Sequence, residues 1–191
     1  LWTGCSQRCD AELRDGDIIF HTSMSSQSYA IQKATKSKYS HCGIIYHKDG
    51  EAYVFEAVQP VKLTPLQEWI DRGRNGSYVV MRLKDSDKLL TDHAMERMLE
   101  VSKGFLGKDY DYTIAWSDDR MYCSELIWKV FERGLGIELC EPSRLGDFDL
   151  SDSAIASKLW ERYGSEIPID EKVVSPAALF KSSFLVTVVQ K

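Results

Sequence analysis

The chain has 191 residues, of which 43% are hydrophobic and 28% are charged, and its formal net charge is −5. This length fits one globular domain with a sizeable core. The negative charge, without a basic stripe anywhere, argues against a nucleic-acid-binding protein. No apolar run approaches the ~18 residues that a membrane-spanning helix needs.

Residues 1–10 differ in character from the rest and predict an N-terminal tail before a single domain over 11–191. The segment Leu1-Trp2-Thr3-Gly4-Cys5 resembles the end of a bacterial lipoprotein signal, in which a small residue precedes a Cys that becomes lipidated. Trp2 stands where such signals usually have Leu. We therefore weigh membrane anchoring through a lipidated Cys5, with a periplasmic or lipid-anchored location in a bacterial cell envelope, against a frayed tail without a role.

The first half of the domain reads as strands with one short helix. A short apolar run, Gly16 to His21, predicts a strand, and residues 25–36 predict a short helix. Two β-rich runs in 40–58 flank Lys48-Asp49-Gly50-Glu51, and Asp-Gly is the strongest short signal for a hairpin. Thr64-Pro65-Leu66-Gln67 then predicts a helix that has Thr64 as its N-cap and Gln67 completing a capping box, and that ends near Gly73.

The second half is mostly helical. We expect a strand over 78–83, helices over 91–106, 119–133 and 152–163, a short helix from Ser175-Pro176, and a last strand over 184–189. Gly107 closes the first of these helices and Ser151 caps the third. Because strands and helices are segregated along the chain rather than alternating, the fold class is α+β with an antiparallel sheet.

Cys123 is the first member of an apolar stripe on the helix predicted over 119–133; the other members are Leu126, Ile127, Val130 and Phe131. It lies close to the positive end of the helix dipole, which stabilises the thiolate, the form that attacks carbonyl groups. A single Cys on such a stripe is more often a small buried hydrophobic residue. Position alone therefore makes Cys123 only a candidate nucleophile.

The hairpin supplies a base for such a nucleophile. If Asp49-Gly50 is a two-residue turn, Lys48 pairs with Glu51, and counting back along the strands places His41 and Glu56 on one face as diagonal neighbours. A carboxylate beside an imidazole accepts its N–H and raises its basicity. The competing interpretation is a solvated Glu56 beside a satisfied polar His41, but their face is otherwise apolar.

The other histidines and cysteines are weaker candidates. His21 ends the first strand and is the one serious rival base, whereas His47 and His93 are expected at the surface. Cys42 should point away from His41 into the core, and Cys140 has no His nearby in a polar loop. Cys5 and Cys9 have no recognised spacing, although they could pair in an oxidising compartment. A zinc site would need close Cys or His pairs, which the sequence lacks, so we expect neither a metal nor another cofactor.

These pieces resemble the YiiX-like branch of the NlpC-type papain-like cysteine hydrolases, which is circularly permuted so that the catalytic His and acidic residue precede the Cys. The resemblance covers roughly residues 15–180. It rests on Gly16 to Phe20, Tyr39 to Ile44, Phe55-Glu56-Ala57, Phe105 to Tyr110, Tyr122 to Leu126, Phe148-Asp149-Leu150, Glu161 to Gly164 and Val174-Ser175-Pro176.

The resemblance implies a permuted papain-like fold and a triad of Cys123, His41 and Glu56. It further implies that Tyr110 is an additional active-site residue, whose hydroxyl donates to the oxyanion together with the Cys123 backbone N–H. Many relatives have a second His or another polar residue in place of Glu56. Asp109 stands where a Pro often precedes the tyrosine.

We therefore expect a cysteine hydrolase or acyltransferase that cleaves an amide or ester through a thioester, acting on a peptide, N-acyl or lipid-like substrate of the cell envelope. An amidase or peptidase with an apolar acyl or peptide site is favoured. The alternatives are a cell-wall endopeptidase of ordinary NlpC-type specificity, a non-catalytic binding module with the same fold, and a structural metal protein.

Overall fold

The computed structural model describes residues 12–191, so the expectations for Cys5, Cys9 and the rest of the N-terminal tail lie outside the described part of the chain. A six-stranded sheet forms the centre, in the order β10-β5-β1-β2-β3-β4, and every neighbouring pair is antiparallel. The strands are β1 (Ile18–Ser23), β2 (His41–Lys48), β3 (Glu51–Glu56), β4 (Lys62–Pro65), β5 (Gly73–Leu83) and β10 (Leu185–Gln190). The predicted α+β class with an antiparallel sheet is confirmed.

The β2–β3 hairpin has the predicted register. Lys48 pairs with Glu51, and the ladder continues to Ile44 opposite Phe55. Both turn residues, Asp49 and Gly50, have positive φ (54° and 84°), the conformation that a tight two-residue hairpin turn requires and that Asp-Gly favours. Because the turn fixes the register, it also fixes which side chains of the two strands share a face.

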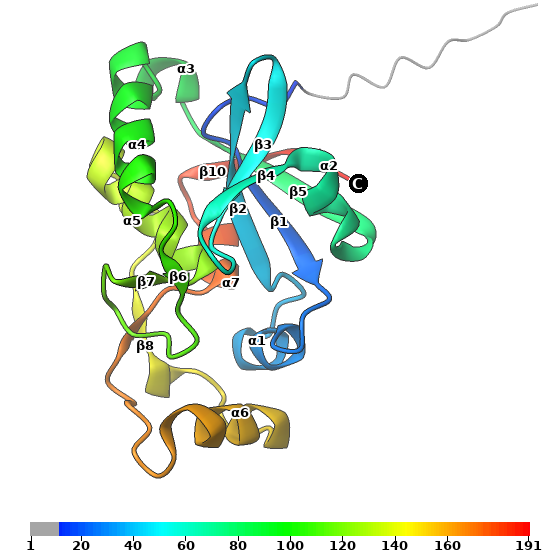
Figure 1. Cartoon of the computed structure of the whole chain (residues 1–191), viewed down its shortest axis with the longest axis vertical. Coiled ribbons are helices and arrows are strands. Elements are labelled where there is room, and N and C mark those ends of the chain that lie inside the picture. The colour runs from blue at the N-terminus through cyan, green and yellow to red at the C-terminus, as the bar shows by residue number, and fades with distance from the viewer. Residues whose placement is uncertain (1–11) are drawn as a thin grey trace, which may run out of the picture.

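The two faces of the sheet carry two separate apolar clusters. One contains Ile19, Ile45, Val54 and Val80 with Trp69 of α2 (Leu66–Asp71), and the larger one lies on the opposite face under α4 (Asp92–Phe105) and α5 (Cys123–Leu135). Figure 1 shows α4 and α5 on one side of the sheet and α2 on the other. The sheet therefore forms a middle layer between helices.

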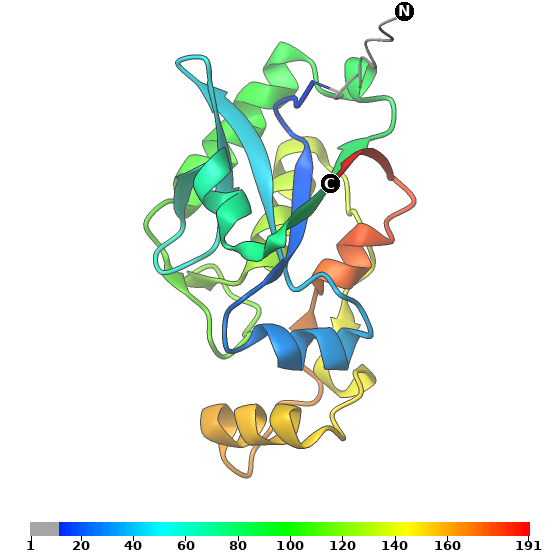
Figure 2. The ribbon, with the colours of Figure 1, turned by 90° about the vertical axis from the view of Figure 1, so that its right-hand side faces the viewer.

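A second group of elements lies at the end of the sheet where β1 ends and β2 begins. There α1 (Ser28–Thr35) packs against α6 (Ser153–Tyr163), and a small cluster around Leu145, Ile155, Leu159 and Val173 fills the space between the neighbouring segments. In Figure 2 these two helices lie one above the other, below the sheet. The remaining elements are α3 (Ser86–Leu89), β6 (Asp109–Tyr110), β7 (Arg120–Met121), β8 (Ser143–Arg144), the 3₁₀ turn Leu145–Asp147, β9 (Lys172–Val173) and α7 (Pro176–Phe180).

Four helix starts differ from the prediction, and the first is α1, which begins at Ser28 rather than at residue 25. Thr64 does not cap α2: it pairs with Val54 within β4, so the helix begins only at Leu66 and Pro65 occupies the cap position without a side-chain bond. Asp152, rather than Ser151, caps α6 by accepting from the Ala154 N–H. Residues 120–121 pair with β6, so α5 begins at Cys123 rather than near residue 119.

No helix within residues 12–191 is both long enough and apolar enough to cross a membrane.

Candidate active site

His41 and Glu56 meet at neighbouring strand ends. His41 is the first residue of β2 and Glu56 is the last of β3, and the His41 Nε2 lies 2.6 Å from the Glu56 Oε2. Glu56 is fully buried, and its other oxygen accepts hydrogen bonds from the Thr64 hydroxyl at 2.6 Å and from the Arg72 guanidinium. Both oxygens of this buried carboxylate therefore have hydrogen-bond partners, and these bonds offset the free-energy cost of burying a charged group.

The hydrogen bonds set the charge of the pair. Burial alone would raise the pKa of Glu56, but the bonds from His41 and Thr64 and the charges of His41 and Arg72 lower this pKa to about 2. Burial would likewise lower the pKa of His41, but hydrogen bonds and charge attraction from Cys123 and Glu56 raise it to about 9. At neutral pH the site therefore holds a carboxylate and an imidazolium.

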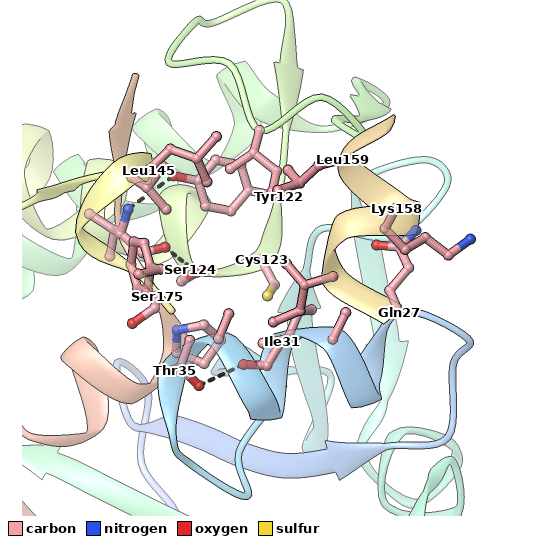
Figure 3. Close-up of a pocket in the computed structure, with 18 of the residues that line it drawn as sticks. Gln27, Ile31, Thr35, Tyr122, Cys123, Ser124, Leu145, Lys158, Leu159 and Ser175 are labelled. Atoms are coloured by element: carbon pink, nitrogen blue, oxygen red, sulfur yellow. Dashed lines mark hydrogen bonds between the residues drawn. The ribbon is translucent and has the colours of Figure 1, made fainter. Parts of the chain in front are cut away.

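Cys123 is the first residue of α5 and points its sulfur into a cavity (Figure 3). Its side chain hydrogen-bonds to Cys42 and His41 at the start of β2. Because Glu56 occupies the Nε2 of His41, Nδ1 is the nitrogen left to face the thiol. The site is assembled where the N-terminus of α5 packs against β2.

The surroundings favour the thiolate form of Cys123. The hydrogen bond from Cys42 makes the largest contribution, and the hydrogen bond and charge of His41 add to it, so that the pKa of Cys123 lies well below its ordinary value although burial opposes this. The first-turn N–H groups of α5 have no partner within the helix and carry the positive end of its dipole. Burial raises the pKa of Cys42 well above the ordinary thiol value, so Cys42 stays a neutral donor.

Tyr110 lies close to Cys123 and His41, because it lines the cavities that these two residues face. It belongs to β6, which runs parallel to β7 with Tyr110 opposite Met121, two residues before Cys123. Burial, and then the negative charge of Cys123, raise the pKa of Tyr110 far above its ordinary value, so that its hydroxyl remains a hydrogen-bond donor at any physiological pH. The structure thus brings together all four residues named from the sequence: Cys123, His41, Glu56 and Tyr110.

The other histidines lie apart from the thiol. His21 is the cross-strand partner of His41 and stacks on Trp69 with ring centroids 3.8 Å apart. Burial and the neighbouring charges of His41 and Arg72 lower the pKa of His21 to about 3, so it is a neutral ring behind His41. His47 pairs with Asp15, and His93 lies beside Glu96; both are solvent-accessible, as expected.

Cys42 has a role that the sequence did not indicate. Its side chain lies on the opposite sheet face from His41, as strand alternation predicts, and it is buried in the cluster under α5. In that cluster it contacts Cys123 and lowers the pKa of the Cys123 thiol. Cys140 is half-buried elsewhere, and burial raises the pKa of its thiol to about 11.

The residues on either side of Cys123 hold the wall of the cavity. The Ser124 hydroxyl donates to the Val174 carbonyl at 2.8 Å, and the Val174 N–H donates to the Tyr122 hydroxyl at 3.1 Å. These two bonds tie the segment between β9 and α7 to the start of α5. The motif that contains Cys123 includes both side chains, but nothing in the sequence indicated which segment they would bind.

An internal ion pair fixes the loop that precedes α5. The Lys129 ammonium, 2% exposed, donates to Glu125 at 2.7 Å, to Asp118 at 2.9 Å and to the Ser117 carbonyl at 2.5 Å. Burial raises the pKa of Glu125 to about 7 although Lys129 opposes this. The loop that precedes Cys123 is thereby held by two contacts, from Ser117 and Asp118, to one buried cation of α5.

Cys123 opens into an apolar cavity that encloses about 840 Å³ of empty space, part of it continuous with solvent. Apolar side chains from α1, α6 and the segments around β8 and β9 form most of its wall. In Figure 3, Tyr122, Leu145 and Leu159 lie on one side of the Cys123 sulfur, and Ile31 and Thr35 of α1 lie on the other. No sequence pattern marked this wall, because it is built from segments that meet only in the folded chain.

His41 faces a second cavity of about 550 Å³, which is far more polar. Its lining includes Ser23, Ser25, Gln59 and Arg72, and Gln27 and Tyr110 belong to the linings of both cavities. The two spaces therefore adjoin at Gln27 and Tyr110.

Comparison with known proteins agrees with this arrangement. The model of the family described as permuted papain-like amidase enzyme, YaeF/YiiX, C92 family, matches residues 12–189. The "Uncharacterized protein YiiX" of Escherichia coli strain K12 is 48% identical over 176 residues, which are 92% of this chain and 86% of the relative. A crystal structure described as metalloprotein yiiX from Escherichia coli O157:H7 superposes with a TM-score of 0.89 at 48% identity, over 93% of this chain and 97% of that one.

The description of that relative as a metalloprotein raises the question of whether this chain has residues that could hold a metal ion. Within residues 12–191, no group of three or more His, Cys, Asp or Glu side chains is placed to hold a metal ion. The side chains of residues 12–191 therefore do not fit a metal centre with three or more such ligands. The family match over nearly the whole chain, together with the relatives at 48% identity, shows that the chain belongs to the permuted papain-like amidase family.

Proposed function

We propose that this protein is a cysteine amidase that transfers the acyl part of its substrate to Cys123, forming a thioester that water then cleaves. The observation that carries the proposal is the Cys123 thiol, held between the imidazole of His41 and the N-terminus of α5 and open to a cavity. A core cysteine would have neither a hydrogen-bonded imidazole nor an open space in front of its sulfur.

The first step is attack by the Cys123 thiolate on the amide carbonyl carbon. His41 holds the proton that the thiol has lost, and Glu56 keeps the ring oriented and positively charged. Thr64 and Arg72 act on the thiol only through Glu56, so they are positioning residues. This role explains why Glu56 is buried next to His41 and accepts hydrogen bonds from three donors.

The negative charge of the tetrahedral intermediate needs hydrogen-bond donors. Two are candidates: the backbone N–H of Cys123 at the start of α5, and the Tyr110 hydroxyl, which stays protonated. His41 then gives its proton to the leaving nitrogen as the C–N bond breaks, leaving an acyl group on the sulfur. Water, deprotonated by the now neutral His41, attacks the thioester and restores the Cys123 thiolate and the imidazolium.

The cavity favours a substrate with an apolar acyl part. Its wall next to Cys123 consists mainly of apolar side chains from α1 and α6, among them Ala30, Ile31, Ala34 and Leu159. Such a wall supports an acyl or apolar peptide group more than the polar peptides and sugars of a bacterial cell wall. An envelope location, and a peptide, N-acyl or lipid-like substrate found there, remain part of the proposal on the sequence arguments given above.

Labelling with a thiol-directed electrophile at about pH 6 tests the reaction centre, because only a thiol with a lowered pKa reacts fast there. We expect fast, stoichiometric modification of Cys123. His41→Ala should slow it by about a hundredfold or more, and Cys123→Ala should abolish both labelling and amide hydrolysis.

Cys140→Ala is the matched control, because Cys140 is half-buried with a raised pKa and does not touch the site. This variant should label and turn over like the native protein. Reaction at Cys123 no faster than at a free thiol, and unaffected by His41→Ala, would instead mean that the fold serves as a binding module.

A further inference from the structure

One carboxylate in the wall of the apolar cavity has an oxygen without a partner. Asp111 is 1% exposed and lines the cavity beside Tyr110 and Cys123. Its Oδ1 accepts from the Thr113 N–H at 2.7 Å and from the Thr113 hydroxyl at 2.6 Å. Its Oδ2 is buried and has no hydrogen-bond partner within the described chain.

No cationic side chain within residues 12–191 pairs with this oxygen. The cavity has two cationic side chains, Lys158 and Arg162, and neither forms an ion pair with Asp111 among residues 12–191; Lys158 pairs with Glu161. The buried Lys129 ammonium is committed to Glu125 and Asp118. An unpaired carboxylate oxygen buried in an apolar wall is costly, so its retention there points to a partner that arrives with the ligand.

The backbone holds the side chain in place. The Asp111 N–H donates to the Met121 carbonyl at 3.0 Å, which ties the residue to β7 immediately before Cys123. The two bonds from Thr113 fix the carboxylate plane from one side, so that only the unpartnered oxygen is available for a new contact. The acceptor is therefore preorganised close to the start of α5 and not carried on a mobile surface side chain.

We propose that Asp111 is a substrate-binding residue, which accepts a hydrogen bond from an N–H group on the acyl part of the substrate. The cavity then selects acyl groups that are apolar over most of their length but carry an amine or an amide N–H at one fixed distance from the scissile carbonyl. Plain fatty acyl groups lack this donor and leave Asp111 unpaired. The inference rests on the proposed function, because it assumes that the acyl part of the substrate occupies this cavity.

The test measures binding without the reaction, in the Cys123→Ala protein. Calorimetry gives dissociation constants for primary alkanamides of increasing chain length, and for the same amides ending in an amine or in an acetylated amine. Because the amide marks the scissile position, chain length scans the distance to Asp111. At one length the N–H-bearing probes should bind about tenfold or more tightly than the alkyl probe.

Asp111→Asn in the same background should remove that advantage while leaving the affinity for alkyl probes unchanged. Asparagine keeps an oxygen for both Thr113 bonds but presents an NH₂ group to the cavity, which cannot accept from an N–H. Asp149→Asn is the matched control: Asp149 is an exposed carboxylate between the wall residues Phe148 and Leu150, and it should change nothing.

A second test changes the probe and leaves Asp111 as it is. A trimethylammonium-ended probe keeps the positive charge of the amine but has no N–H, so it should lose the advantage. The inference is overturned if no N–H-bearing probe gains over its alkyl counterpart at any length, or if the gain persists in Asp111→Asn. These outcomes are separate from the proposed reaction, which labelling of Cys123 in the native protein tests independently.

Discussion

Two cavities adjoin beside the candidate active site, one lined by Cys123 and the other by His41, and they are built in opposite ways. The one in front of Cys123 is walled by apolar side chains of α1, α6 and the segments near β8 and β9. The one beside His41 is lined by hydroxyl, amide and guanidinium groups from the ends of the sheet strands and the loops beside them. Gln27 and Tyr110 contribute to both linings.

The difference assigns a side to each part of an amide. The acyl part, which stays on the sulfur after the first step, needs a place to remain, and the apolar cavity offers it. The leaving nitrogen must pass His41 to receive its proton, and the polar cavity begins there. Under the proposed function, we expect substrate selection on the two sides to rest on different physical terms, burial of apolar surface on one and hydrogen bonding or charge on the other.

The largest expected effect comes from placing a charge in the apolar wall. Ile31→Asp should lower kcat/KM for long-chain acyl anilides by about a hundredfold, because their chains would have to desolvate a carboxylate. Acetyl anilide, whose chain does not reach the wall, should be cleaved nearly as before. Tyr29→Asp, on the exposed side of the same helix, is the control. Equal losses for long and short acyl groups would show that the chain does not occupy this cavity.

A smaller effect is expected on the polar side. Arg72 is the cation of that cavity, so Arg72→Ala should lower about tenfold the preference for a carboxylated over a plain anilide leaving group. Thr64→Val removes another donor to the same Glu56 oxygen but leaves the cavity lining unchanged. If both variants lower the preference for the carboxylated leaving group equally, Arg72 acts through Glu56, and the polar cavity does not bind the leaving group selectively.

A third effect concerns the pH dependence of stability and the ring of His21, which lies behind His41. The pKa of His21 is lowered to about 3, so its contribution to stability is complete above the unfolded value of 6.5 and is lost as pH falls towards 3. His41, with a pKa of about 9, stays protonated in both states below 6.5, and its contribution is lost only as pH rises through 9. Urea unfolding of His21→Asn should therefore show less acid destabilisation than the native protein, by about 1 kcal/mol per pH unit between 6.5 and 4.5.

The comparison of variant with native protein is needed because Glu125 acts in the opposite direction over the same range. Its pKa is raised to about 7, so it contributes stability that is fully present below the unfolded value of 4.5 and is lost as pH rises towards 7. Glu125 is unchanged in His21→Asn, and its contribution cancels in the difference. Identical pH slopes for the two proteins would mean that His21 is not held neutral.

The sequence predicted the parts of the site that depend on local rules. Asp49-Gly50 set the hairpin register, and that register was enough to place His41 and Glu56 together. A local rule also misled: Thr64 and Gln67 had the spacing of a capping box, but pairing within β4 took Thr64 out of the helix and turned its hydroxyl towards Glu56. Tertiary pairing overrode a local preference.

The cavities could not be predicted, because their walls join segments whose sequences show no sign of meeting. Helices α1 and α6 are far apart in the chain, and each has an ordinary amphipathic pattern. The unpartnered oxygen of Asp111 is likewise invisible in the sequence, which does not show which groups surround this side chain in the fold. A missing hydrogen bond can be recognised only when every neighbour is known.

The packing of the start of α5 against β2 has a consequence for how the folding of this protein can be followed. The low pKa of Cys123 exists only while His41 and Cys42 touch it, and those residues come from a distant part of the chain. When the helix separates from the strand, the thiol becomes an ordinary one and its reactivity at acidic pH disappears. Loss of labelling at Cys123 at acidic pH should therefore report the separation of α5 from β2 without any attached probe.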